Sequence, residues 1–139
     1  MAVLSGRTAA EEKKLWLIRD WHDGTLGIYG YKGDDTEITI PAMIGKKRVT
    51  TLFRTPYKNF AQYVALTKVI ISEGIERIEE KTFEWWFNPG LTEIVIPASV
   101  TEIEEQDFRF PEDVTIYGVP GSCAEKYAEE HGISFVVKT

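Results

Sequence analysis

The stretch that decides the fold is LTKVIISEGIERIEEKTF, residues 66–83, which returns in altered form as LTEIVIPASVTEIEEQDF, residues 91–108. Six apolar positions recur at a constant offset of 25 residues, with charged or small residues between them. The pairs are Leu66 and Leu91, Val69 and Ile94, Ile71 and Ile96, Ile75 and Val100, Ile78 and Ile103, and Phe83 and Phe108. A period of this length is typical of repeat proteins, in which neighbouring units bury each other's apolar faces.

Two degenerate copies flank this pair. Upstream, residues 37–52 (EITIPAMIGKKRVTTL) place Ile38, Ile40, Val49 and Leu52 on the same apolar skeleton. Downstream, Val114 and Ile116 take the positions of Ile94 and Ile96. We therefore expect about four repeat units with irregular ends, because terminal repeats have to cap the stack.

Each unit begins with an L-x-x-I-x-I pattern, whose alternation predicts a β-strand with one buried face. Strands one unit apart run parallel, and parallel crossovers are almost always right-handed. The sequence thus predicts a short, right-handed, leucine-rich-repeat-like α/β solenoid. Cross-strand pairing places Thr39, Ile70 and Val95 in one outward ladder and Glu37, Lys68 and Glu93 in the next. The apolar ladder is expected either to lie under a loop or to contact a partner.

The two ends have their own patterns. Alternating apolar residues on either side of Asp23-Gly24 predict a hairpin over Leu15–Tyr31, with Asp-Gly as its turn. Ser122 and Glu125 form a capping-box pattern for a short helix that ends before Gly132, and a strand is expected over Ile133–Val137. The expected division is a tail at 1–14 and one domain at 15–139, made of a hairpin cap (15–35), repeats (36–121) and a helix-and-strand cap (122–139). Within the tail, Thr8 and Glu11 are an alternative signal for a helical turn.

Three features resemble BspA-type leucine-rich repeats of bacterial surface proteins. The first is the unit IVIPASVTEI (94–103), and the second is the phenylalanine five residues after it, Phe108, with Phe83 at the same position of the preceding unit. The third is the ending TIYGVPGSCAEKYAEEHGISFVV (115–137). The resemblance implies a fold used for adhesion and protein contacts. The family's Gly-Cys after the phenylalanine is replaced here by residues 84–88 (EWWFN) and 109–111 (RFP).

Composition narrows the function classes. The net charge is −6 and the sixteen basic residues are spread along the chain, so nucleic acid is not an expected partner. Apolar runs are no longer than a strand, so membrane insertion is not expected. Residues 1–10 lack the pattern of a signal peptide, which favours the cytoplasm, or the cell surface if a signal has been removed. Cys123 is the only cysteine, which excludes an internal disulfide.

Catalytic chemistry has few candidates. The two histidines, His22 and His131, are expected at opposite ends of the stack, too far apart to act together. The pairs Glu79-Glu80 and Glu104-Glu105 are a weak signal for a carboxylate hydrolase, and we expect them on solvated turns. Asp20, His22 and Asp23 are residue types that turns favour for backbone reasons, so we do not expect them to be metal ligands. No catalytic, cofactor or metal residue is predicted.

These patterns predict a non-enzymatic protein-binding or scaffolding module. The candidate contact residues are large side chains in the loops that close each unit, together with the apolar ladder: Trp85, Trp86, Phe87, Phe110, Tyr57, Phe60, Ile70 and Val95. The expected partner is a protein, and self-association stays open. The alternative is an intracellular bacterial or phage inhibitor or regulator that acts by steric blocking.

Overall fold

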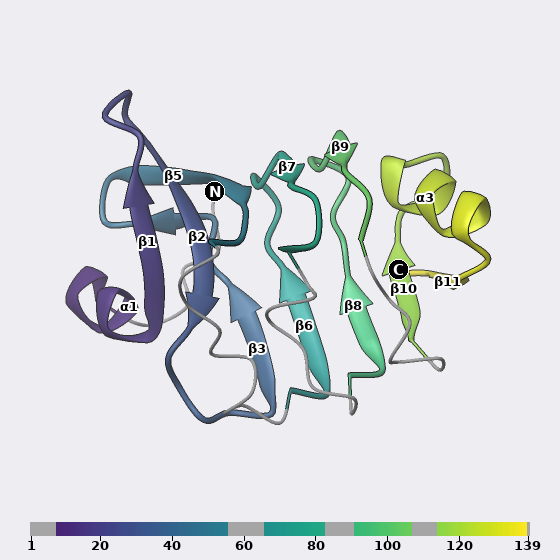
Figure 1. Ribbon diagram of the computed structural model, residues 1–139, viewed down its shortest axis with the longest axis horizontal. Helices are drawn as coiled ribbons and strands as arrows, with labels where there is room; N and C mark the ends of the chain where they lie inside the picture. Colours follow the sequence, from purple (N-terminus) through teal and green to yellow (C-terminus); the bar gives the residue numbers. More distant parts are fainter. Residues whose placement is uncertain (1–7, 56–65, 83–90, 107–113, 139) are drawn as a thin grey trace.

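The computed structural model describes residues 8–55, 66–82, 91–106 and 114–138, which form two sheets and two helices. The first sheet has the order β11-β10-β8-β6-β3 and all its strands are parallel. Its strands are β3 (Glu37–Ile40), β6 (Lys68–Ile71), β8 (Glu93–Val95), β10 (Thr115–Gly118) and β11 (Ser134–Val137). Figure 1 shows them side by side in chain order, one from each repeat unit before the final β11.

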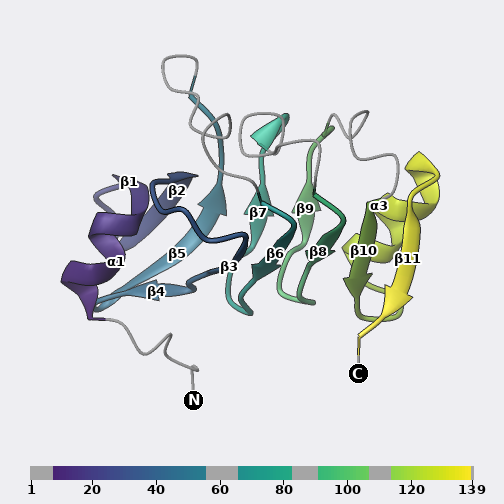
Figure 2. The same ribbon diagram turned by 90° about the horizontal axis from the view of Figure 1, so that it is seen from below.

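The second sheet has the order β1-β2-β5-β7-β9, with β4 paired to β5. Its strands are β1 (Trp16–Asp20), β2 (Thr25–Tyr31), β4 (Met43–Ile44), β5 (Lys47–Leu52), β7 (Arg77–Ile78) and β9 (Glu102–Ile103). In the first three repeat units the second half adds one strand here, β5, β7 or β9, in the same order as in the first sheet (Figure 2). The chain has an α/β leucine-rich-repeat-like architecture of two strand layers.

The predicted register is confirmed. Ile38, Val69, Ile94 and Ile116 are consecutive Cα partners across β3, β6, β8 and β10, and all four are buried. The second apolar patch of the repeats also lies inside, with Ile75, Ile78 and Val100 almost wholly excluded from solvent. The core thus lies between the two sheets. The 25-residue period exists because each unit has to fill an equivalent section of that core.

Polar side chains that are partly or wholly buried join one unit to the next. Ser99 Oγ donates to the carbonyl of Ile75 and accepts from the N–H of Gly74, both at 2.8 Å. Gln106 Nε2 donates to the carbonyls of Glu79 (2.6 Å) and Glu104 (2.7 Å), and its side chain is buried. These contacts satisfy backbone groups in places where the chain turns between strands.

The N-terminal segment differs from the expected tail at 1–14. Helix α1 spans Ala9–Leu15, and its capping box joins Thr8 and Glu11 as the alternative signal indicated. The buried carboxylate of Glu12 accepts a 2.6 Å hydrogen bond from Trp16 Nε1, and the Trp16 ring packs 5.0 Å from that of Tyr31. Residues 9–14 are therefore ordered, because this bond and the tryptophan hold the helix against the hairpin.

The predicted hairpin is formed by β1 and β2, with Gly24 at a positive φ of 92° in its turn. It does more than cover the end of the stack, because β2 also pairs in parallel with β5 and so belongs to the second sheet. Where β2 pairs with β5, position 27 has to be glycine, since a Cβ there would lie 2.7 Å from both the Trp21 and the Phe53 rings. The hairpin is therefore part of the second sheet, and its apolar side chains contribute to the core.

The C-terminal cap contains α3 (Cys123–His131) and β11, as expected. Ser122 Oγ accepts from the N–H of Glu125, and Gly132 ends the helix in the left-handed conformation at φ 66°. The capping box is only half formed, however, because the Glu125 carboxylate accepts from the N–H of Gly121 at 2.9 Å. This hydrogen bond stabilises the turn before the helix, where Gly121 has a positive φ of 77°.

Candidate functional site

The outward face of the first sheet carries a groove of about 1090 Å³. Thr39, Ile70 and Val95 are Cα partners across β3, β6 and β8, as predicted, and all three line the groove. The same ladder continues to Tyr117 on β10 and Val136 on β11. Val95 is only 7% exposed although it faces outward between Ile70 and Tyr117 in the ladder.

The groove is closed differently at its two ends. At one end lie Ala9 of α1 together with Trp16 and Tyr31 of the hairpin, and at the other lie Val119 and Lys138. In Figure 2, α1 lies beside one end of the row of strands and β11 beside the other. The floor between them is largely apolar, and no described segment covers Ile70, which is only half-buried.

Carboxylates dominate the charged groups of the groove. Asp35, Glu37 and Glu73 are exposed on its lining, whereas Lys138 is the only basic lining residue among the described residues. The Asp35 carboxylate accepts a 2.5 Å hydrogen bond from the Tyr31 hydroxyl, which holds it at the rim. The groove thus combines an apolar floor with a negative rim, a surface that attracts cationic groups.

The structure places the predicted contact residues in two classes. Ile70 and Val95 lie side by side in the groove, as described above. Six others lie outside the described residues: Tyr57, Phe60, Trp85, Trp86, Phe87 and Phe110. The groove itself was not predicted, because its ends are built by Ala9, Trp16, Tyr31 and Lys138, which lie far from the ladder in sequence.

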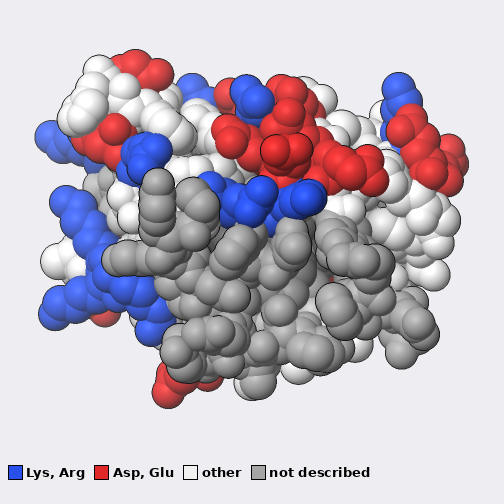
Figure 3. Space-filling model, viewed as in Figure 1, with Lys and Arg blue, Asp and Glu red and all other residues white. Residues whose placement is uncertain are grey.

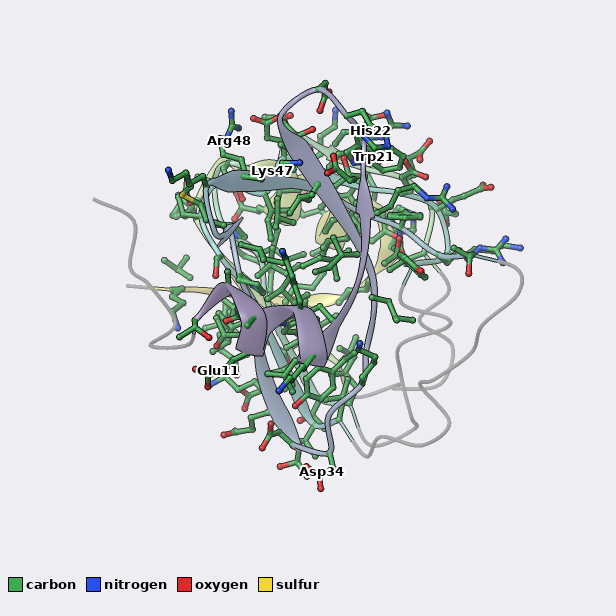
Figure 4. All side chains as sticks on the ribbon, turned by 90° about the vertical axis from the view of Figure 1, so that its left-hand side faces the viewer. Glu11, Trp21, His22, Asp34, Lys47 and Arg48 are labelled. Carbon is green, nitrogen blue, oxygen red and sulfur yellow. The ribbon has the colours of Figure 1, made fainter. Side chains whose placement is uncertain are left out.

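The histidines lie in separate parts of the structure. His22 is at the hairpin tip beside Trp21, at the opposite end of the hairpin from Glu11 and α1, and its side chain is 88% exposed (Figure 4). His131 is the last residue of α3, where its Nε2 contacts the Glu105 carboxylate at 2.9 Å. The Glu105 hydrogen bond raises the pKa of His131, and burial opposes this rise. Neither histidine lines the groove.

The paired glutamates do not form a shared acidic cleft. Glu104 lies 3.5 Å from the Arg77 guanidinium, which also lies 3.6 Å from Glu102. Glu105 contacts His131, and Glu80 is exposed. Figure 3 shows acidic side chains gathered over β7 and β9 with basic ones beside them. Among the described residues, no group of His, Cys, Asp and Glu has the arrangement to hold a metal ion.

The remaining residues considered for metal binding or catalysis are Asp20 and Asp23 at the hairpin turn and Cys123 at the start of α3. The Asp20 carboxylate accepts from the His22 N–H at 2.8 Å and bonds Lys47 on β5, and the Lys47 bond holds the pKa of Asp20 below its ordinary value. Asp23 accepts from the N–H and hydroxyl of Thr25, which lowers its pKa in the same way. Cys123 is half-buried at the start of α3, and burial raises the pKa of its thiol.

Comparisons with known proteins identify one solved structure with the same fold. The chain is similar to a leucine-rich cell surface protein from Faecalibacterium prausnitzii A2-165, with 23% sequence identity and a TM-score of 0.57. The match covers 86% of this chain and 30% of that protein, so the chain spans less than a third of its structural neighbour. No protein-family model and no curated protein matches the sequence. No helix among the described residues is long and apolar enough to cross a membrane.

Proposed function

We propose that the chain is a non-enzymatic protein-binding module, built as a short right-handed solenoid of the BspA type, and that its groove binds an extended polypeptide carrying basic and apolar side chains. The observation that carries this proposal is the Ile70–Val95 floor inside a groove with an acidic rim. Apolar surface framed by polar residues is the usual anatomy of a protein-interaction site.

The chemistry of the occupant follows from the lining. Ile70, beside the nearly buried Val95, offers aliphatic contacts to side chains that point toward the sheet, and Asp35, Glu37 and Glu73 offer partners to lysine or arginine at the rim. A polypeptide with alternating basic and apolar residues meets both demands when it is extended, because successive side chains then point in opposite directions. The rim charges contribute specificity and association rate more than affinity.

The structural neighbour supports the same class of function. That neighbour is a leucine-rich cell surface protein, and this location fits a protein that acts through contacts with other molecules. Surface display of this chain is part of the proposal and rests on that likeness and on the BspA-type motifs. A fold by itself does not assign function, so the groove carries the argument.

The loop aromatics are the second element of the proposal. Trp85, Trp86, Phe87, Phe110, Tyr57 and Phe60 supply residue types that are enriched at interaction hot spots. We assign them to the partner surface as an additional contact region. Replacing Trp85 or Trp86 with Ser tests this assignment, because a hot-spot residue contributes about 2 kcal/mol or more to binding.

The experiment is a selection of displayed twelve-residue peptides on the purified chain, followed by calorimetric titration of the enriched peptides. The proposal expects enrichment of lysine or arginine with aliphatic residues, and a dissociation constant that rises with salt. Ile70→Thr, which copies Thr39 in the same ladder, and Glu73→Lys should each weaken binding, whereas the exposed control Thr92→Ala should not. Selected peptides without basic residues, or binding indifferent to both variants, would overturn the groove assignment.

A further inference from the structure

The C-terminal strand β11 is the edge of the five-stranded sheet, and Figure 2 shows it as the outermost strand on its side. Three large apolar side chains of the described residues are markedly exposed, and all three lie at this end: Val119 (39%), Val136 (45%) and Val137 (47%). The strand itself, SFVV, contains no charged residue or proline of the kind that normally protects an edge.

The hydrogen-bonding direction of β11 follows from one backbone hydrogen bond to β10. The Lys138 N–H donates to the carbonyl of Gly118 on β10 at 2.8 Å. In a strand, the N–H and C=O of one residue point to the same side and those of the next residue to the opposite side. Ser134 and Val136 therefore face β10, whereas Phe135 and Val137 direct their N–H and C=O groups toward the open edge.

We propose that β11 pairs antiparallel with β11 of a second copy of this chain, about a two-fold axis at Val136. With this register the outward groups of Phe135 bond those of Val137 in the other copy, and the reciprocal pair forms by symmetry. The edge is thus complementary to itself, which is the requirement for an isologous two-fold dimer. Val136 then lies opposite its own symmetry mate.

The side chains fit the same arrangement. Val136 shares the outward ladder of Ile70 and Val95, so the two exposed valines meet on the groove face and become buried. Phe135 pairs with Ile116, on the core side, where the absence of a side chain at Gly118 leaves room for its ring. Both grooves of the dimer then open on the same side of one continuous sheet. The contact is small, so the dimer is weak and depends on concentration.

Disulfide trapping tests the register. In an antiparallel sheet, directly opposed residues of a non-hydrogen-bonded pair have Cα atoms about 4.5 Å apart, within reach of a disulfide. In a Cys123→Ser background, Val136→Cys should therefore cross-link rapidly on mild oxidation. Val137→Cys is the matched control with nearly equal exposure. Its symmetry mate lies on the diagonal, about 7–8 Å away, so it should cross-link much more slowly.

Proline substitution tests the hydrogen bonds. Val137→Pro removes an N–H that faces the open edge, a position where an edge strand tolerates proline. Sedimentation velocity over a concentration series should show the dimer dissociation constant rising roughly tenfold or more, with an unchanged melting temperature. Val136→Pro removes an N–H that faces β10, so it should lower the melting temperature as well.

Three results would overturn the proposal: a parent chain that remains monomeric at millimolar concentration, equal cross-linking of Val136→Cys and Val137→Cys, or a dimer that Val137→Pro leaves intact. None of them depends on whether a peptide binds the groove. A failure of the peptide selection with a positive cross-linking result would refute the proposed function and leave the dimer standing.

Discussion

His131 Nε2 lies 2.9 Å from Oε2 of Glu105, so this pair connects the end of helix α3 to the segment that follows β9. The His131 ring also stacks on Tyr127 at 3.9 Å, and its Nδ1 lies 2.8 Å from the Tyr127 carbonyl. Tyr127 in turn accepts a hydrogen bond through its hydroxyl from the N–H of Gln106. Two neighbouring residues, Glu105 and Gln106, thus hold the C-terminal helix against the repeats.

We expect this contact to make stability depend on pH. The Glu105 hydrogen bond raises the pKa of His131 above 6.5, the ordinary value for the unfolded chain, with a smaller contribution from Glu130. The stabilisation is then complete below about pH 6.5 and is lost as the pH rises through the elevated folded-state pKa. Because the Glu105 side chain is 72% exposed and solvent screens the pair, this stabilisation should be about 0.2–1 kcal/mol.

Urea denaturation of the parent and of His131→Gln at pH 5.5 and pH 8.5 measures this effect. The difference in unfolding free energy between the two proteins should be larger at pH 5.5. Glu105→Gln should reduce the same pH dependence, since it removes the carboxylate that stabilises the imidazolium. A difference that stays constant over this pH range would show that the charge on His131 adds nothing to stability.

Ile96 should be essential to the core. It is 2% exposed and occupies the repeat position of Ile71, so Ile96→Ala should destabilise the protein by about 2–5 kcal/mol through lost contacts and a cavity. Thr92→Ala, at an exposed position in the same unit, should cost under about 1 kcal/mol, although its hydroxyl lies 3.3 Å from the Thr67 carbonyl. Equal denaturation midpoints for the two variants would contradict the register.

The buried Gln106 side chain should be needed for stability, because it donates hydrogen bonds to two carbonyl groups. Gln106→Leu removes the donor to the carbonyls of Glu79 and Glu104 and should cost about 1–3 kcal/mol, the penalty for leaving a buried acceptor unsatisfied. The Glu79 carbonyl keeps a 2.7 Å bond from Thr82 Oγ, so most of the loss falls on Glu104. Thermal unfolding measures the effect, with the exposed variant Thr101→Ala as control. A Gln106→Leu protein as stable as the parent would refute this role.

Cys123 should react slowly as a nucleophile. Burial raises the pKa of its thiol above 9.0, so little thiolate is present near neutral pH. A disulfide reagent such as dithiobis-nitrobenzoate should modify it more slowly than it modifies glutathione at pH 7.5, with a rate that increases toward pH 9. The melting temperature should not change when reductant is added, because one cysteine forms no internal bridge. A large reductant effect would instead reveal an intermolecular disulfide.

The strand register was predictable because it depends on a short-range rule that each unit repeats. Val69 and Ile94 had to become partners, since a shift by one residue would turn every buried side chain of a strand outward. The Thr39–Ile70–Val95 ladder follows from the same rule and is confirmed. The terminal hairpin and helix were also predictable, because Asp23-Gly24, Ser122 and Gly132 act on the backbone within a few residues of themselves.

Local signals did not predict the contacts between distant parts of the chain. The pairing of β2 with β5 and the groove that α1 and Lys138 close depend on which surfaces meet after the units stack. Gln106 shows the same limit, since its repeat equivalent Lys81 is exposed, and the Gln106 amide is buried where it reaches the Glu79 carbonyl of the neighbouring unit as well as the nearby Glu104 carbonyl.

The sequence by itself determined the repeat period, the strand register and the two end caps, because hydrophobic burial and backbone geometry impose them within each unit. Only the tertiary structure decided that the ladder lies in an acidic groove and that β11 presents a self-complementary edge. Both features arise when residues far apart in the chain come together. Their physical basis is the burial and hydrogen-bonding direction of each group in the folded state, which no local pattern encodes.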